Sequence, residues 1–330
     1  MKQTSHSNAL SKRQFIGAVG AFALSPTLLM AQTPGVIKLI IPYGPGGPTD
    51  VVARLVSTQL QTILKQTVIV ENKPGAGSAI GARFVANSTA DGRTILIGNV
   101  STYAIAPATM KNPGYDPVKS FAPIVQTSDI CSVMVTGTSF PANTVQEFVT
   151  YARANPGKIS YGSAGIGSTP HLTGDHVLRV LGKLDAIHIP FQGAAPALNA
   201  TMANQVQLAS VALPPAVPLI KSGKLKALAV TSLKRLDALP NVPTVSESGF
   251  SDFEDYTWVG LFAPTKLPND LLNRLNGLIN EAVRQPDFRD KLNAAGFEAQ
   301  TGSPQYFNDY LKLELTKWGK IVKETGVSPQ

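Results

Sequence analysis

The sequence predicts an α/β fold built from two domains. Short apolar runs alternate with amphipathic helical stretches, a pattern typical of a parallel sheet covered by helices on both faces. Several of the apolar runs end in loops rich in glycine and hydroxyl side chains. The chain has 330 residues, which at roughly 100–200 residues per domain indicates two domains. Its hydrophobic content of 43% is enough to bury a sizeable core.

The first strand, loop and helix lie between residues 36 and 64. The apolar run 36–41 predicts a buried strand, and the Gly- and Pro-rich stretch 42–48 predicts a loop. Thr49 or Asp50 can cap the helix that follows. Bare N–H groups and the positive end of a helix dipole converge at such a loop, so it is suited to bind an anion. A tight turn without a ligand explains the same pattern equally well.

Two further strands of the first series also end in polar loops. The strand 68–70 leads into the glycine loop 71–78, and the strand 94–98 ends in the polar tip 99–102. Ligands of parallel sheets bind beyond the carboxyl ends of the strands. All three loops lie at such ends, and this placement favours a ligand-binding role for the first loop.

A second series begins after an apolar strand at about 128–136. Thr144 and Glu147 form a capping box that opens a helix. The strand 159–161 is followed by a glycine and hydroxyl loop, residues 162–170, in which Ser168 can cap the next helix. The other predicted elements are strands at 186–190, 206–211, 225–231 and 256–262, and helices at about 194–203, 268–284, 286–295 and 304–324. The last strand and the last three helices are expected to return to the first domain and cover it.

Residues 1–31 have the pattern of an export signal. A basic segment ending in Lys12 and Arg13 precedes an apolar run that is too short to span a membrane, and cleavage is expected near Ala31. The stretch 11–16 also resembles a twin-arginine signal, with Lys in the first basic place. Both the general secretory and the twin-arginine routes therefore stay open, and we expect a soluble, exported protein.

The composition argues against nucleic-acid binding. The formal net charge is +8, but it is spread along the chain without a block of five or six like charges. The single cysteine, Cys131, lies in an apolar run and cannot form an internal disulfide. It is expected to be a small buried hydrophobe.

Catalytic patterns are incomplete in this sequence. A serine-hydrolase elbow at Ser163 would need glycine where Tyr161 stands, and the glycine loops lack dinucleotide and phosphate-loop spacings. His171 and His176 are five residues apart, on different helix faces, so a shared zinc site is not expected. We predict no enzyme activity, no cofactor and no metal; a hydrolase that uses Ser168 and His171 is the enzymatic alternative.

Several motifs together resemble those of one protein family. They lie in order over nearly all of residues 35–325, at positions 42–50, 71–77, 92–94, 115–117, 161–172, 190–193, 221–231 and 240–244. In this set, PYGPGGPTD, ENKPGAG and YGSAGIGS resemble signatures of the Bug family, the substrate-binding proteins of tripartite tricarboxylate transporters. The resemblance implies a two-lobed periplasmic-binding-protein fold (Venus flytrap, type II) with a mainly parallel sheet in each lobe. Lobe 1 is expected at 32–132 plus 256–330, and lobe 2 at 133–255.

The resemblance also implies a ligand-binding site between the lobes. Main-chain groups of lobe 1 would hold a carboxylate, and lobe 2 would close over the rest of the ligand. The expected site residues are Tyr43, Gly46, Gly47, Pro48, Thr49, Ser78, Asn99 and Ser101 in lobe 1, and Ser163, Gly165, Ser168, Thr169, His171, Phe191, Gln192, Gly193 and Val211 in lobe 2. For His171, local capping or packing is the alternative. Asp50 is interpreted as a residue that fixes the loop, because its carboxylate would repel an anionic ligand.

Two departures from the family pattern concern the ligand. Phe191 stands where Tyr is frequent, and Val211 stands where Asp is common. Both changes make lobe 2 less polar, so we expect a ligand with an apolar or aromatic body. The sequence thus predicts a monomeric periplasmic protein that captures a small organic carboxylate and delivers it to membrane transporter subunits. A ligand sensor with a signalling partner would use the same fold, and the sequence does not separate the two.

Overall fold

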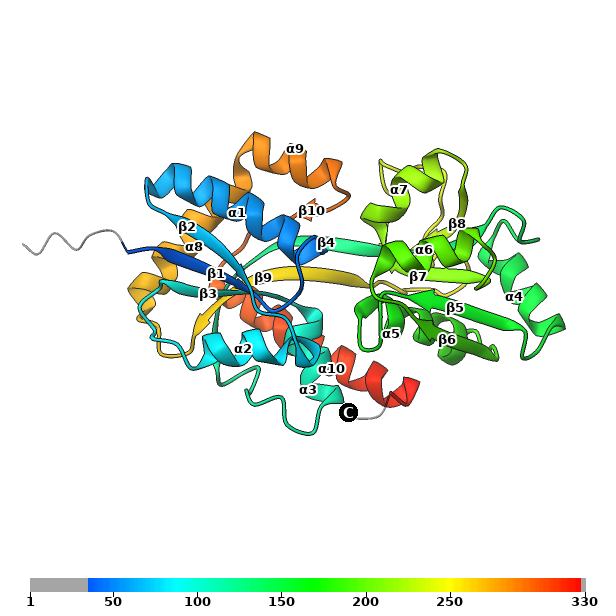
Figure 1. Cartoon of the computed structure of the whole chain (residues 1–330), viewed down its shortest axis with the longest axis horizontal. Coiled ribbons are helices and arrows are strands. Elements are labelled where there is room, and N and C mark those ends of the chain that lie inside the picture. The colour runs from blue at the N-terminus through cyan, green and yellow to red at the C-terminus, as the bar shows by residue number, and fades with distance from the viewer. Residues whose placement is uncertain (1–34, 328–330) are drawn as a thin grey trace, which may run out of the picture. The chain divides into compact units, whose positions relative to one another are not determined.

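The computed structural model describes residues 35–327, all of which belong to one compact unit. The export signal predicted at residues 1–31 lies outside the described residues. Strands and helices alternate along the chain, and the strands form two sheets that share one long strand, β4 (Phe121–Gly137) (Figure 1). Within residues 35–327, none of the helices has the length and apolar character needed to cross a membrane.

The first sheet is mixed. Its strand order is β2-β1-β3-β9-β4, and the short strand β10 also pairs with β4. β1 runs parallel to β2 and β3, whereas β9 runs antiparallel to β3 and β4. The bounds are β1 (Ile37–Ile41), β2 (Val68–Asn72), β3 (Thr94–Asn99), β9 (Tyr256–Pro264) and β10 (Glu298–Ala299).

Helices cover both faces of the first sheet because β1 is apolar on both sides. Alternate residues of a strand point to opposite faces. Leu39 and Ile41 pack with α1 (Pro48–Leu64), α8 (Asn269–Arg284) and α9 (Pro286–Ala294). Ile40, on the other face, packs with α2 (Ala79–Ala86) and α10 (Pro304–Thr325). The three helices predicted at 268–284, 286–295 and 304–324 are therefore confirmed, as is their role as cover for the first sheet. The remaining short helical segments of this half are η1 (Ala76–Ser78), η2 (Ser101–Ile105) and α3 (Ala106–Thr109).

The second sheet repeats this arrangement. Its strand order is β4-β7-β5-β6, with β8 also paired to β4. β5 runs parallel to β6 and β7, and β4 runs antiparallel to β7 and β8. Each sheet thus has three neighbouring parallel strands joined to antiparallel ones. The bounds are α4 (Val145–Ala154), β5 (Ile159–Ser163), α5 (Thr169–Asp175), η3 (His176–Leu181), β6 (Ala186–Pro190), α6 (Ala194–Met202), β7 (Leu208–Ala212), α7 (Leu213–Lys221) and β8 (Leu225–Val230).

Two adjacent segments connect the halves of the molecule. In β4, Cys131 pairs with Tyr256 of the first sheet, and the next residue, Ser132, pairs with Ala212 of the second. The returning chain enters the first sheet next to this crossing. The N–H of Asp255, one residue before β9 begins, donates at 2.9 Å to the carbonyl oxygen of Thr231, which follows β8. Cys131 is buried, as predicted.

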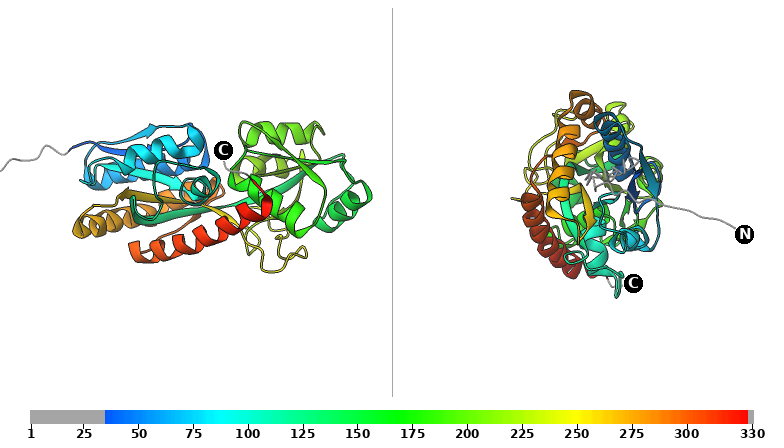
Figure 2. Two further views of the ribbon diagram at one scale, coloured as in Figure 1. Left: turned by 90° about the horizontal axis from the view of Figure 1, so that it is seen from below. Right: turned by 90° about the vertical axis from the view of Figure 1, so that its left-hand side faces the viewer.

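Helix α10 reaches beyond the first sheet. It extends along the first half, and its C-terminal end lies next to the second half (Figure 2). Lys317 Nζ lies 3.9 Å from Oδ1 of Asp255, and Glu324 pairs with His176 of η3 at 3.8 Å. The last helix therefore contacts the segment that joins the two halves, which the sequence pattern did not indicate.

Candidate ligand-binding site

The loop between β1 and α1 is tied to the end of β3. The hydroxyl of Tyr43 donates to Oδ1 of Asn99 at 2.5 Å, and Nδ2 of Asn99 donates to Oγ1 of Thr49 at 3.1 Å. The N–H of Ser101 donates to the same Oδ1 at 2.8 Å. Burial raises the pKa of Tyr43 to about 12, so its hydroxyl is a neutral donor. The structure thus brings together four residues that the sequence predicted for the site.

Asp50 fixes this loop from behind. Its carboxylate accepts hydrogen bonds from the N–H of Gly46 at 3.1 Å, from Asn72 Nδ2 at 3.0 Å and from Arg54 Nε at 2.8 Å. Burial alone would raise the pKa of Asp50, but the bonds from Arg54, Asn72 and Gly46 outweigh it and hold the pKa below its ordinary value. These three donors satisfy the carboxylate within the protein, which explains how it can lie next to a loop that is predicted to bind an anion.

Two details of the first loop correct the sequence predictions. Helix α1 begins at Pro48 with Gly47 as its N-cap, and no side chain caps it, so the prediction of Thr49 or Asp50 as the cap is wrong. The N–H of Gly46, predicted to bind a carboxylate, already donates to Asp50. The N–H groups of Gly47 and Thr49 have no hydrogen-bond partner within residues 35–327. Since Pro48 carries no N–H, Gly47 and Thr49 supply the backbone donors at this helix start.

Ser78 lies at the end of the second glycine loop. It is buried at the N-cap of α2, with a positive φ of 85°. Its loop is held beside the first one, because Asn72, the last residue of β2, donates through Nδ2 to the carbonyl oxygen of Tyr43 at 3.1 Å. The carboxyl ends of β1, β2 and β3 therefore meet, as expected for a parallel sheet.

The loop after β5 is built on the same plan in the second sheet. Ser168 is the N-cap of α5, as predicted, and its Oγ accepts from the N–H of His171 at 3.3 Å and donates to the carbonyl oxygen of Gly165 at 2.7 Å. Ser163 is fully buried, and its Oγ accepts from the N–H of Gly165 at 3.2 Å. Between these anchors the side chain of Ile166 is 56% exposed.

The predicted turn at residues 191–193 lies beside this loop. The N–H of Phe191 donates to the carbonyl oxygen of Ser163 at 3.1 Å. The Phe191 ring covers Gly162, where an added Cβ would lie 3.0 Å from ring atom Cε2. Gln192 is exposed, and Gly193, at φ 112°, is the N-cap of α6.

Val211 is placed differently from the prediction. Its side chain is fully buried in the hydrophobic cluster with Ala197, Leu198 and Ala216, under α6 and α7. It pairs with Val133 and is the fourth of the five residues of β7, close to the carboxyl end of that strand. The strand pleat directs its side chain into the core, so this geometry does not favour the ligand contact that the sequence predicted.

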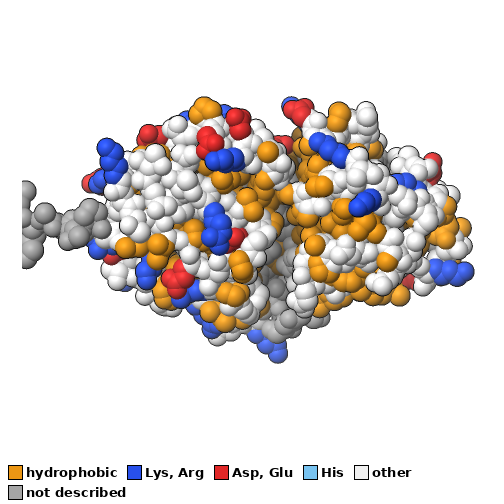
Figure 3. Space-filling view, turned by 45° about the horizontal axis from the view of Figure 1, so that its top comes forward, with side chains coloured by type: hydrophobic (Ala, Val, Ile, Leu, Met, Phe, Trp, Pro, Cys, Tyr) orange, Lys and Arg blue, Asp and Glu red, His pale blue; other side chains and the backbone are white. Residues whose placement is uncertain are grey.

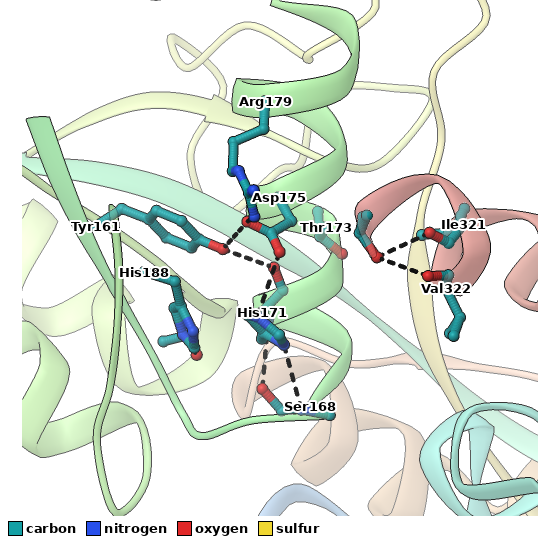
Figure 4. A network of polar contacts seen from close by, with 12 residues as sticks. Tyr161, Ser168, His171, Thr173, Asp175, Arg179, His188, Ile321 and Val322 are labelled. Carbon is teal, nitrogen blue, oxygen red and sulfur yellow. Dashed lines mark hydrogen bonds and ion pairs between the residues drawn. The ribbon is translucent and has the colours of Figure 1, made fainter. Parts of the chain in front are cut away.

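His171 lies behind the loop, with both ring nitrogens engaged. Nδ1 accepts from the N–H of Gly167 at 3.2 Å, and Nε2 lies 3.4 Å from Oδ2 of Asp175. Tyr161 and Arg179 converge on the same carboxylate, at 2.7 and 3.2 Å from its Oδ1 (Figure 4). With the ring buried and both nitrogens engaged, this geometry favours the local-packing alternative for His171 over direct ligand contact.

Sequence reasoning missed the partners of His171. The i, i+4 spacing of His171, Asp175 and Arg179 on one helix was the available signal. Burial would raise the pKa of Asp175, but hydrogen bonds from His171 and Tyr161 outweigh it and lower that pKa. His188 of β6 stacks on His171 at 3.9 Å between ring centroids, and burial, with the nearby His171, lowers its pKa to about 4.

The geometry does not support the hydrolase alternative. Oγ of Ser168 is bonded to backbone groups, and Nδ1 of His171 is taken by Gly167. A second pair, Ser163 Oγ and His188 Nε2 at 2.7 Å, has the spacing of a nucleophile and base. Ser163 is fully buried, and its Oγ also accepts from the N–H of Gly165, which holds it as part of the loop. Among the described residues no three His, Cys, Asp or Glu side chains cluster as a metal site would require.

The surface between the two halves is hollowed. Figure 3 shows a groove across the molecule, with hydrophobic side chains along it, most densely on the side of the second half. A fold of two α/β lobes with glycine and hydroxyl loops at the strand ends defines the class of solute-binding proteins. Within that class, the chain belongs to the tripartite tricarboxylate transporter family of receptors, whose family model matches residues 52–327.

Solved structures confirm the two-lobed fold and the resemblance to the Bug family. The periplasmic binding protein BugD is 36% identical, with a TM-score of 0.79 over 89% of this chain and 99% of that one. An R. palustris protein with adipate is 30% identical, with a TM-score of 0.82 over 90% of this chain and 100% of that one. MatC from Rhodopseudomonas palustris, with bound malate, is 30% identical, with a TM-score of 0.77 over 87% and 98% of the two chains.

Proposed function

We propose that the protein is a periplasmic solute-binding protein that captures an organic carboxylate between its two lobes. The observation that carries the proposal is the start of α1. There the N–H groups of Gly47 and Thr49 have no partner in the described chain and lie at the positive end of a helix dipole. Such a site binds a carboxylate without a fixed positive charge. The structural relatives with adipate and malate support this choice of ligand class.

The lobes are proposed to close on the ligand about the two connecting segments. Residues 32–132 with 256–330 would form lobe 1, and residues 133–255 would form lobe 2. The adjacent crossings at Cys131 and Asp255 suit a hinge, because few residues there need to change their dihedral angles. The loop around Ile166 and the turn at Phe191 would then cover the part of the ligand that lobe 1 leaves open.

A ligand with an apolar or aromatic body is proposed from the character of lobe 2. Phe191 has no hydroxyl, Ile166 is exposed at the loop tip, and hydrophobic side chains are dense on this side of the groove (Figure 3). We further propose that the chain is exported through its N-terminal signal, acts as a monomer without catalysis or a cofactor, and delivers its ligand to the membrane subunits of a tripartite transporter.

A thermal-shift screen tests the ligand class. The panel contains mono-, di- and tricarboxylates, aromatic acids and amino acids, and adipate and malate are included. A ligand at a hundred times its dissociation constant should stabilise the protein by about 2.7 kcal/mol. A folded sample that shifts with none of these compounds would refute the carboxylate proposal. Tight binding of small, fully polar carboxylates alone would refute the apolar body.

Gly47→Pro tests the binding mode. Gly47 has φ −79°, which proline adopts without strain, so the variant deletes one free N–H and should keep or raise the melting temperature. Affinity for the compound found in the screen should fall about tenfold for one lost charge-assisted hydrogen bond. Gly44→Ala, in the same loop with open space around the added Cβ, is the matched control. Equal affinity of Gly47→Pro and wild type would show that this helix start does not hold the ligand.

A further inference from the structure

The short loop between β5 and α5 is held by side-chain acceptors at two glycine amides. The N–H of Gly165 donates to Oγ of Ser163, and the N–H of Gly167 donates to Nδ1 of His171. Both glycines have positive φ, 125° and 74°. Ile166 lies between them, and its own N–H has no partner in the part of the chain that the structure describes. The two acceptors therefore decide which way the peptide groups of this tip point.

The bond from Gly167 fixes the tautomer of His171. An imidazole nitrogen that accepts an N–H carries no proton. The proton of a neutral His171 must then be on Nε2, which lies 3.4 Å from the carboxylate of Asp175. Asp175 is in turn held by Tyr161 from β5 and by Arg179 from η3. With Nε2 facing Asp175, the proton-free Nδ1 faces the N–H of Gly167 in the loop.

Two other helices begin with the same device. In α1 the N–H of Gly46 donates to Asp50, and in α4 the N–H of Asn143 donates to Glu147 at 2.7 Å. In each case the acceptor lies four residues after the donor, at the third position of the helix. In these two helices the acceptor is a carboxylate, whereas α5 uses an imidazole. A carboxylate keeps its acceptor capacity at neutral pH, but an imidazole loses it when it takes up a second proton.

The groups that face His171 come from each element packed against it. They are Asp175 on its own helix, Tyr161 on β5, His188 on β6 and Arg179 on η3. A proton on Nδ1 would place an N–H against the N–H of Gly167 and break the bond that orients the loop.

We propose that His171 is a positioning residue that sets the ligand-facing conformation of the loop 164–168 through its proton-free Nδ1, with Asp175, Tyr161 and Arg179 fixing the tautomer. It acts through Gly167 and does not touch the ligand. The inference rests on the proposed carboxylate-binding function only for its effect on affinity. The state of the loop itself is measurable without a ligand.

NMR of the ligand-free protein provides the first test. Long-range proton–nitrogen correlations of the ring should show the Nε2–H tautomer of His171 at neutral pH, and the Gly167 amide should be protected from exchange. His171→Gln keeps a polar partner near Asp175 but has no acceptor at the Nδ1 position, so the protection of Gly167 should fall at least about tenfold. His171→Asn places its amide oxygen near Nδ1 and should keep most of the protection. An Nδ1–H tautomer, or unchanged protection in His171→Gln, would overturn the proposal.

Calorimetry with adipate and malate as probes provides the second test. His171→Gln should bind the probe about tenfold more weakly at pH 7.5, and His171→Asn less than about threefold. His176→Gln, one turn on and paired with Glu324, is the control and should behave as wild type. If neither probe binds the wild type, the binding proposal loses support for these two acids while the NMR result still decides the role of His171. If a probe binds equally well after Gly167 protection is lost, the positioning role is refuted.

Discussion

Asp50→Ala should destabilise the protein and should leave its order of ligand preference unchanged. The substitution removes a nearly buried carboxylate that accepts from Gly46, Asn72 and Arg54. The donors are left without an acceptor, and the loop between β1 and α1 loses its support. No contact with a ligand is removed, because the carboxylate is already satisfied.

The magnitude follows from the exposure of each partner. Hydrogen bonds to a charged group contribute about 1.5 kcal/mol or more each, and this applies to the bonds from Gly46 and Asn72. The Arg54 side chain is 57% exposed, so its i, i+4 pair with Asp50 adds only about 0.5 kcal/mol. The free energy of unfolding should therefore fall by at least about 3.5 kcal/mol at pH 7.

Urea unfolding of Asp50→Ala and wild type measures this difference. The matched control is Asp287→Ala, which breaks an i, i+4 pair with Lys291 in which both side chains are more than half exposed; it should cost less than about 0.5 kcal/mol. Because the pKa of Asp50 is lowered in the folded state, its contribution is present above its unfolded pKa of about 3.9 and is lost as the pH falls through the folded value. The gap between wild type and variant should close accordingly in acid.

Binding separates the structural role of Asp50 from a direct one. Loss of the Gly46 anchor should weaken every carboxylate of the panel by a similar factor, since the loop must be ordered again on binding. Unchanged stability together with lost binding, or a reversal of ligand preference, would refute the argument that Asp50 acts only on the loop.

Two other substitutions test the surroundings of the site. Burial raises the pKa of Asp255, so the folded state holds the proton of this carboxyl group more strongly than the unfolded state does. The free energy of unfolding of the wild type should therefore fall as the pH rises above about 4. In urea unfolding, Asp255→Asn should show no such fall and should be at least as stable as the wild type at pH 8. Gly81→Ala would place a Cβ 2.8 Å from Cα of Pro42 and 2.9 Å from the carbonyl oxygen of Lys73, and these backbone atoms cannot move easily. The substitution should lower the free energy of unfolding by about 2 kcal/mol in the same assay, and it should weaken ligand binding because Pro42 leads into the first loop. A loss below about 0.5 kcal/mol would contradict this packing.

Much of the fold could be predicted because local signals agree with the tertiary structure. Ser303 and Pro304 mark the start of α10, and Ser303 does accept from the N–H of Tyr306. The capping box at Thr144 and Glu147 opens α4 as expected. The glycine loops also lie where the alternation of strands and helices places them. In these stretches, capping chemistry and hydrophobic period point to one answer.

Other elements have contradictory local signals. Helix α7 contains Pro214, Pro215 and Pro218, which indicate a loop. Proline is tolerated in a first helical turn, and the burial of Leu213 and Ala216 against the second sheet favours the helix at Pro218. For Val211 the neighbours Ala209 and Ala212 are apolar too, so no alternation in the sequence shows which face of β7 is buried.

The sequence predicts which residues lie in the two loops, but not the direction in which their polar groups point. The sequence predicts that Gly46 and His171 belong to ligand-binding loops, but not that the Gly46 amide points back to Asp50 or that Nδ1 of His171 accepts from the N–H of Gly167. These directions depend on Asn72 and Tyr161, which approach from neighbouring strands. Contacts of that kind are set by sheet register and are invisible in the local pattern.

The two loops share one construction and differ in its chemistry. In each, the glycine before the N-cap donates to the third residue of the helix, and an i, i+4 partner on the same helix supports that residue: Arg54 for Asp50 and Asp175 for His171. The first loop thus carries a buried negative charge neutralised by arginine, whereas the second carries a neutral ring backed by a carboxylate. A carboxylate suits the loop that is proposed to bind the charged group of the ligand. It stays ionised near neutral pH, so its hydrogen bond to the N–H of Gly46 does not change there. In the second loop the acceptor is Nδ1 of His171, which can hold the N–H of Gly167 only while it carries no proton.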